Sequence, residues 1–198
     1  MTFAFSFFFP FLLVLAAAQS TVGQKMRGSW MTLFLVILAG LIVLIPFRGI
    51  ALGRWIISLN ANFSIPLTAL LLSRVWKNTF GVELLDEKAC FTAWLFGLFT
   101  GLVLYPMALG LGRFDPYSLG WQFSGLFVLL PALTIGLLII GNRFAYVLMC
   151  CILGYDLQLL ESVNLWDYLV DPFFALIAAI VLGVRFIQRT CFKSTVSG

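Results

Sequence analysis

The densest group of side chains that could do chemistry is a set of four carboxylates within sixteen residues: Asp156, Glu161, Asp167 and Asp171. Carboxylates at such positions can act as general acids and bases. Asp156 falls inside the end of an apolar run, where a charge is costly and by default marks a functional residue. Asp156 and Glu161 are therefore the candidate catalytic bases, although a pairing with Arg113 or simple protonation would give Asp156 a purely structural role.

Two aspartates have a simpler interpretation, because each is followed by proline. Asp115 precedes Pro116, and Asp171 precedes Pro172. Aspartate is a favoured helix N-cap, proline is favoured at the first helical position, and a negative charge suits the positive end of the helix. We therefore expect Asp115 and Asp171 to cap helices. Asp167 is expected to lie before the helix that Asp171 caps, since Pro172 disfavours an earlier start of that helix.

Three arginines extend this polar set, because the favoured membrane topology places them on the same side as the carboxylates. A guanidinium group binds phosphate through two parallel hydrogen bonds. The sequence therefore predicts a binding site for a phosphate-bearing or zwitterionic headgroup. Its residues are Arg48, Arg54, Arg113, Asp115, Asp156, Glu161 and Asp167. Ordinary solvated loops contain the same residue types, and this is the alternative.

Several classes of site are excluded by residues that the sequence lacks. The chain has no histidine, and its four cysteines do not have metal-ligand spacing. No Walker loop or dinucleotide fingerprint occurs. We therefore expect no metal and no cofactor. The twelve Lys and Arg residues are scattered through the loops rather than gathered in a stripe, so we expect no nucleic-acid partner.

The elements that must position these residues are strongly apolar. Of the 198 residues, 62% are apolar and 10% are charged, and the mean hydropathy is +1.08. A globule of this size cannot bury so much apolar surface, so lipid must face most of it. The apolar runs are continuous and have the length of spanning helices rather than of barrel strands. The predicted fold is an all-α integral membrane protein, a bundle of about six or seven transmembrane helices with short loops.

Seven apolar segments are candidate spans: Phe3–Ala18, Trp30–Phe47, Trp55–Ser73, Ala89–Gly112, Trp121–Ile140, Phe144–Leu160 and Pro172–Ile187. The first ends in alanines, as a signal peptide does, but lacks a basic n-region. Residues 1–25 are therefore predicted to be a hydrophobic N-terminal segment, transmembrane or signal-like, and residues 26–198 a single polytopic domain. Trp55–Ser73 contains several polar residues, yet it lacks the basic face of an interfacial helix, which favours a span.

Basic residues set the orientation of the bundle. Arg185, Arg189 and Lys193 follow the last span, whereas the loop before that span carries only acidic charges. By the positive-inside rule the C-terminus is cytoplasmic and the loop is external. If Trp55–Ser73 spans, the three arginines of the predicted site are external and the other nine basic residues are internal. The expected location is a bacterial cytoplasmic membrane, because no organelle-targeting segment is evident.

Small residues recur at four-residue spacing in two of the spans. They are Ala93, Gly97 and Gly101 in one span and Ala175, Ala179 and Gly183 in the other. Such faces allow helices to approach closely in lipid. We expect both faces to be buried against other helices, either of this chain or of a protein partner.

The small size and the sparse polar residues favour a non-enzymatic subunit or assembly partner of a larger cell-envelope membrane complex. One alternative is a transporter or flippase of a lipid or lipid-linked molecule, for which Asn60, Asn62 and Thr68 are the polar positions within a span. A second alternative is a membrane-embedded headgroup transferase that uses the external carboxylate Asp156 or Glu161 as its base. Membrane lipids are expected to contact the protein in each case.

Overall fold

The protein is all-helical, as the sequence predicts. A computed structural model describes residues 2–22 and 29–196, with side chains described for residues 7–21 and 30–189. Nine α-helices lie within this described part of the chain, together with one two-residue antiparallel β-hairpin. Hydrogen bonding within helices satisfies the backbone without water, which suits a chain that is mostly apolar.

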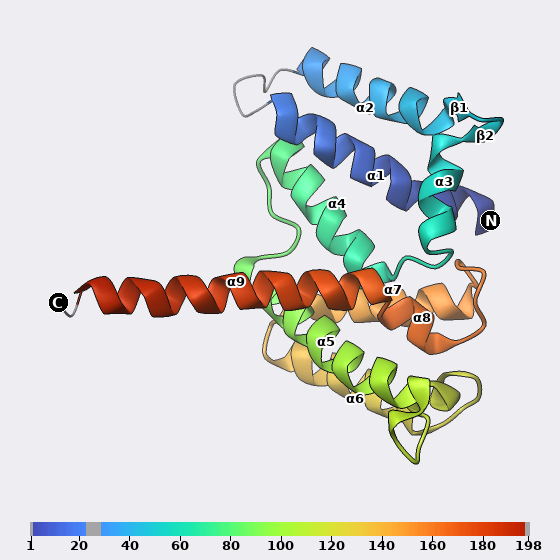
Figure 1. Ribbon diagram of the computed structural model, residues 1–198, viewed down its shortest axis with the longest axis vertical. Helices are drawn as coiled ribbons and strands as arrows, with labels where there is room; N and C mark the ends of the chain where they lie inside the picture. The colour runs from blue at the N-terminus through green and yellow to red at the C-terminus, as the bar shows by residue number, and fades with distance from the viewer. Residues whose placement is uncertain (1, 23–28, 197–198) are drawn as a thin grey trace.

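The N-terminal half forms one layer of helices (Figure 1). Its elements are α1 (Thr2–Val22), α2 (Ser29–Leu44), β1 (Pro46–Phe47), β2 (Ile50–Ala51), α3 (Leu52–Leu59) and α4 (Ile65–Phe80). Helix α1 contacts both α2 and α4. Leu12 and Leu15 of α1 are buried with Leu35 and Ala39 of α2 and Val75 of α4. The part of the predicted segment 1–25 that the structure describes is therefore packed into the bundle. Whether this segment is cleaved as a signal peptide stays untested.

The C-terminal half holds the larger core. Its elements are α5 (Glu87–Pro106), η2 (Met107–Leu111), η3 (Pro116–Gly120), α6 (Gly125–Ile139), α7 (Phe144–Asp156), α8 (Leu165–Leu169) and α9 (Pro172–Val196). Helix α9 packs on α5, and α6 packs on α7. Phe144, Leu148, Tyr168 and Phe174 are buried at the centre of this half. The C-terminal part of α9 projects beyond the other helices (Figure 1).

Helices α1, α2, α4, α5, α6, α7 and α9 run across the view in Figure 1 and alternate in direction, which gives the bundle two ends. At one end, the basic end, lie residues 81–86, residues 140–143 and the C-terminal part of α9. Lys88 Nζ donates to the Ile140 carbonyl there at 3.2 Å. At the other end lie residues 60–64, 112–124 and 157–171. Each end of the bundle is therefore formed by a different set of connections between helices.

Two of these helices are long and apolar enough to cross a membrane. They are the stretch Glu87–Leu111, which joins α5 to η2, and the stretch Pro172–Arg189 of α9. Shorter apolar helices cover Phe7–Thr21, Trp30–Leu44, Gly125–Ile139 and Phe144–Asp156. Of the six or seven predicted spans, two are thus supported by helix length and composition, and the others stay predictions.

The prediction of one continuous span over Trp55–Ser73 is wrong. Helix α3 ends at Leu59, an extended segment follows, and α4 begins at Ile65. Asn60 Nδ2 donates to the Asn62 carbonyl, and Asn60 Oδ1 accepts from the Asn62 N–H, so the polar pair forms a local turn that competes with a helix. Helix α4 continues to Phe80 and makes the crossing from one end of the bundle to the other.

The small-residue faces behave differently in the two helices. On α5 the expectation is confirmed: Gly97 and Gly101 are buried, and a Cβ at Gly101 would lie 2.4 Å from the Cβ of Ala175. On α9, Ala179 and Gly183 are exposed within this chain, so burial of that face against a protein partner stays a prediction. The small side chains of α9 leave space beside α5 instead of closing it.

Candidate functional site

The predicted site residues lie at the end of the bundle formed by the connections after α3, α5 and α7. We call residues 60–64, 115–120 and 160–171 the loop cluster. Its centre is Tyr117, whose hydroxyl donates to Asp167 Oδ1 at 3.1 Å and to Oδ2 at 3.0 Å. Burial raises the pKa of Tyr117 to about 12, and the Asp167 charge and hydrogen bond add to the rise. The phenol therefore stays protonated and links η3 to α8.

Asn164 joins the same two elements from a fully buried position. Its Nδ2 donates to the Tyr117 carbonyl at 3.1 Å, and its Oδ1 accepts from the Trp166 N–H at 2.9 Å, so it caps α8. The Trp166 indole donates to the Pro116 carbonyl at 2.8 Å. Gly120 makes room for this packing, because a Cβ there would lie 1.8 Å from Asn164 Oδ1. The cluster therefore requires a small residue at Gly120.

Asp171 joins α9 to the start of α4. Its Oδ1 accepts from the N–H groups of Phe173 at 2.9 Å and Phe174 at 3.1 Å, and its Oδ2 accepts from the N–H of Ser64 at 2.9 Å. The predicted N-cap is confirmed. Asp171 is only 2% exposed, and burial raises its pKa, while hydrogen bonds from Ser64 and the two N–H groups oppose the rise.

Asp115 is the second predicted cap, and it is also confirmed. Its Oδ1 accepts from the Tyr117 N–H at 2.9 Å at the start of η3. Unlike Asp171, Asp115 is exposed, so its loss leaves a donor that water can reach. Each aspartate uses its Oδ1 on backbone donors of its own helix, as the Asp-Pro pattern predicts, and Asp171 uses its Oδ2 on Ser64 as well.

The two candidate bases are not held against a reacting partner. Asp156 is the last residue of α7, and its side chain is exposed. Glu161 is also exposed, and its backbone N–H, not its carboxylate, donates to Asn62 Oδ1 at 3.1 Å. Within the described part of the chain neither carboxylate accepts a hydrogen bond or forms an ion pair. A catalytic role for either residue therefore stays a prediction.

The three arginines are spread over the outside of this end of the bundle. Arg48 lies in the β1–β2 turn, where its guanidinium is 5.7 Å from the Phe47 ring, and Arg54 lies on α3. Arg113 follows η2. In Figure 1 the β1–β2 hairpin, which contains Arg48, lies at the top, and the connection after η2, which contains Arg113, lies at the bottom. The structure gathers Asp115 and Asp167 around Tyr117 but does not bring these two arginines together.

No protein-family model matches this chain, and no curated protein or solved structure is significantly similar to it. The residues themselves must therefore carry the functional interpretation. Among the described residues, no group of three or more Cys, Asp and Glu side chains is placed to hold a metal ion.

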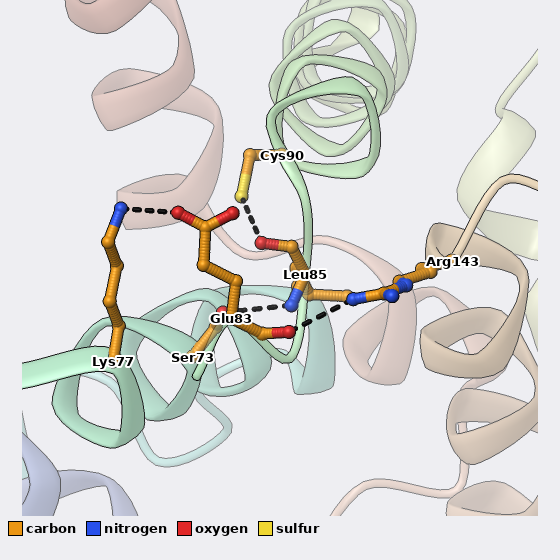
Figure 2. Close-up of polar contacts among 6 residues, drawn as sticks. All are labelled: Ser73, Lys77, Glu83, Leu85, Cys90 and Arg143. Atoms are coloured by element: carbon orange, nitrogen blue, oxygen red, sulfur yellow. Dashed lines mark hydrogen bonds and ion pairs between the residues drawn. The ribbon is translucent and has the colours of Figure 1, made fainter. Parts of the chain in front are cut away.

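A second group of polar residues lies at the basic end, around the segment that connects α4 to α5. Figure 2 shows its residues: Ser73, Lys77, Glu83, Leu85, Cys90 and Arg143. Arg143 Nη1 donates to the Glu83 carbonyl at 2.9 Å, and Ser73 Oγ accepts from the Leu85 N–H at 3.1 Å. The Glu83 carboxylate also pairs with Lys77. The Arg143 side chain, which follows α6, thus holds the connection before α5 in place.

Sequence reasoning missed Ser64, Asn164 and Arg143 as connecting residues. For Asn164 a signal exists, because Asn before Leu165-Trp166-Asp167 is a favoured helix start. For Ser64 and Arg143 no local signal exists, since their partners lie 107 and 60 residues away along the chain.

Proposed function

We propose that the protein is a non-enzymatic membrane subunit that stabilises or positions a larger membrane complex. The observation that supports this best is the use of its buried polar side chains. The buried side-chain oxygens of Asn164 and Asp171 accept hydrogen bonds from backbone N–H groups, and the Tyr117 hydroxyl donates a hydrogen bond to Asp167. A general base needs a free site next to a substrate proton, and these groups join helices instead.

The proposed membrane placement follows from the alternating helices. In this placement α1, α2, α4, α5, α6, α7 and α9 cross the bilayer, the loop cluster lies outside, and the basic end lies in the cytoplasm with the C-terminus. The positive-inside rule supports this orientation, because Arg74, Lys77, Lys88 and Arg143 lie at the same end as the C-terminal arginines. A bacterial cytoplasmic membrane remains the proposed location.

Helix length supports association with a partner. Helices α2, α6 and α7 have 16, 15 and 13 residues. At 1.5 Å per residue they reach about 20–24 Å, whereas the hydrocarbon core is about 30 Å thick. Short spans are accommodated by bilayer thinning or by oligomerisation. A partner that packs beside α2 or α6, the two helices at the edges of the bundle, would relieve this mismatch.

Gentle purification in native lipid, followed by mass spectrometry of bound proteins, tests the proposal. We expect a stoichiometric protein partner. Gly40→Leu on α2 and Gly136→Leu on α6 place bulk where a Cβ meets nothing within 4 Å inside the chain, so one of them should reduce recovery of the partner. Recovery of the protein with lipid alone, in both the unaltered chain and the variants, would contradict the proposal.

A further inference from the structure

A groove opens between α5 and α9 toward the basic end. The two helices are in close contact at Gly97 and Gly101, where a Cβ would meet Phe174 or Ala175. Further along α9 the small residues Ala179 and Gly183 leave a groove of about 460 Å³. This volume lies within the range of pockets that hold small molecules, about 300–1,000 Å³.

The lining of this groove is apolar along most of its length. Phe91, Leu95 and Leu98 of α5 face Leu182 and Gly183 of α9. The path along α5 from Leu98 to the start of the helix is about 16 Å at 1.5 Å per residue. A path of this length with an apolar lining suits an extended hydrocarbon chain better than a compact polar molecule.

The mouth of the groove is cationic. An adjoining space of about 440 Å³ is lined by Lys88, Arg185 and Arg189, together with Glu87 and Phe91. Phe91 and both arginines line the groove as well, so the two spaces are continuous. Among the side chains that the structure describes, neither arginine forms an ion pair. Three cations against one carboxylate leave the mouth with a net positive charge.

We propose that this groove binds one anionic phospholipid. The phosphate lies at the mouth, where Arg185 and Arg189 donate charge-assisted hydrogen bonds and Lys88 adds a third charge. An acyl chain lies along Phe91, Leu95 and Leu98. Charge complementarity selects an anionic headgroup, and the apolar length selects a lipid over a free phosphate. In the proposed orientation the mouth faces the cytoplasmic leaflet, to which basic segments bind through anionic headgroups.

Native mass spectrometry of the full chain in detergent, titrated with phosphatidylglycerol or phosphatidylcholine, tests this inference. We expect tighter binding of phosphatidylglycerol. Arg185→Gln/Arg189→Gln should weaken it about tenfold or more, because charged hydrogen bonds to phosphate are lost. Gly183→Leu should weaken it similarly by filling the groove, since a Cβ at Gly183 meets nothing within 4 Å.

Two matched variants separate the groove from general effects. Arg74→Gln removes an exposed charge at the same end, and Gly136→Leu adds the same bulk to a different exposed helix; both should bind phosphatidylglycerol as the unaltered chain does. A cooperative thermal unfolding transition, measured for each variant in detergent, is the check that the variant is folded.

Four outcomes would overturn the inference. They are equal binding of the two lipids, unchanged binding in both groove variants, equally tight binding of glycerol phosphate that Gly183→Leu leaves intact, and a dimer that Gly183→Leu abolishes without any bound lipid. The last outcome would assign the groove to a second copy of the chain. Each outcome is independent of whether a protein partner is recovered.

Discussion

At the scale of single residues, the aspartates of the loop cluster differ in what surrounds them rather than in their chemistry. Asp171 accepts three backbone hydrogen bonds from a buried position, and one of them comes from Ser64, the residue before α4. Asp115 makes a cap of the same type on the surface. An unsatisfied donor is costly only where water cannot reach it.

Asp171→Ala should therefore lower the free energy of unfolding by about 2–3 kcal/mol, because it leaves the buried N–H groups of Ser64 and Phe174 without an acceptor. Asp115→Ala is the matched control, since it removes an exposed cap and should cost about 1 kcal/mol or less. Thermal or denaturant unfolding in detergent measures both. Equal effects of the two substitutions would show that the Ser64–Asp171 contact does not hold the helices together.

The raised pKa of Asp171 gives a pH dependence of known sign. The folded carboxyl keeps its proton to a higher pH than the ordinary 3.8, so between these values the folded state binds more protons than the unfolded state. Its contribution to stability is full below pH 3.8 and is lost as pH rises through the folded pKa.

Asp171→Asn does not titrate, so the difference in unfolding free energy between the unaltered chain and this variant isolates the effect. Unfolding measured from below pH 3.8 to neutral pH should show the difference moving in favour of the variant and then levelling off. A difference that moves the other way as pH rises would contradict the account.

Local residue pattern explains what could be predicted at this scale. Both Asp-Pro caps were predictable, because a cap and its donors lie within three residues of each other. The Tyr117–Asp167 bond was not, since its partners are 50 residues apart and only the packing of η3 on α8 brings them together.

At the scale of elements, glycine decides where helices and loops approach closely. Gly101 lies where α5 meets Ala175 of α9, and Gly120 lies where η3 meets Asn164. Each position excludes a methyl group because a neighbouring atom occupies its space. The four-residue spacing on α5 predicted the first contact. The same spacing on α9 did not predict exposure of Ala179 and Gly183, because spacing does not say how far along a helix its neighbour extends.

Gly101→Ala should push α5 from α9 and destabilise the protein by about 1–3 kcal/mol, as overpacking does. Gly136→Ala on α6 is the control, because its added methyl meets no atom within 4 Å and alanine favours the helix. The melting temperature in detergent should fall for the first variant and hold or rise for the second. The same response in both would contradict the close contact.

Gly120→Ala should disrupt the loop cluster in the same way, because the new methyl overlaps Asn164. Gly125→Ala, a few residues along at the exposed start of α6, should be tolerated. Hydrogen exchange at the Trp166 amide, which Asn164 accepts from, reports the difference: it should be faster only in the Gly120 variant. Unchanged exchange in that variant would show that the cluster tolerates the methyl.

At the scale of the whole molecule, the alternation of helix direction places two different sets of charges at the two ends of the bundle. Composition predicted the helices and their apolar character, and the basic residues predicted which connections share an end. The break between α3 and α4 was not predicted from hydropathy, because Asn60, Asn62 and Ser64 form a turn whose apolar neighbours still resemble a span. Helix α4 nevertheless runs from one end of the bundle to the other in Figure 1, so the β1–β2 hairpin and α3 lie at the same end as the loop cluster, and the membrane side of Arg48 and Arg54 stays a prediction.

The most direct test of the account is whether the loop cluster and the basic end face opposite sides of a membrane. Val163→Cys and Val82→Cys are matched exposed positions, one at each end, placed in a chain whose four native cysteines are replaced by alanine. A membrane-impermeant maleimide should label the Val163→Cys chain in intact cells and the Val82→Cys chain only after permeabilisation. Labelling of both chains from the same side would contradict the proposed membrane crossing of α5, α6 and α7.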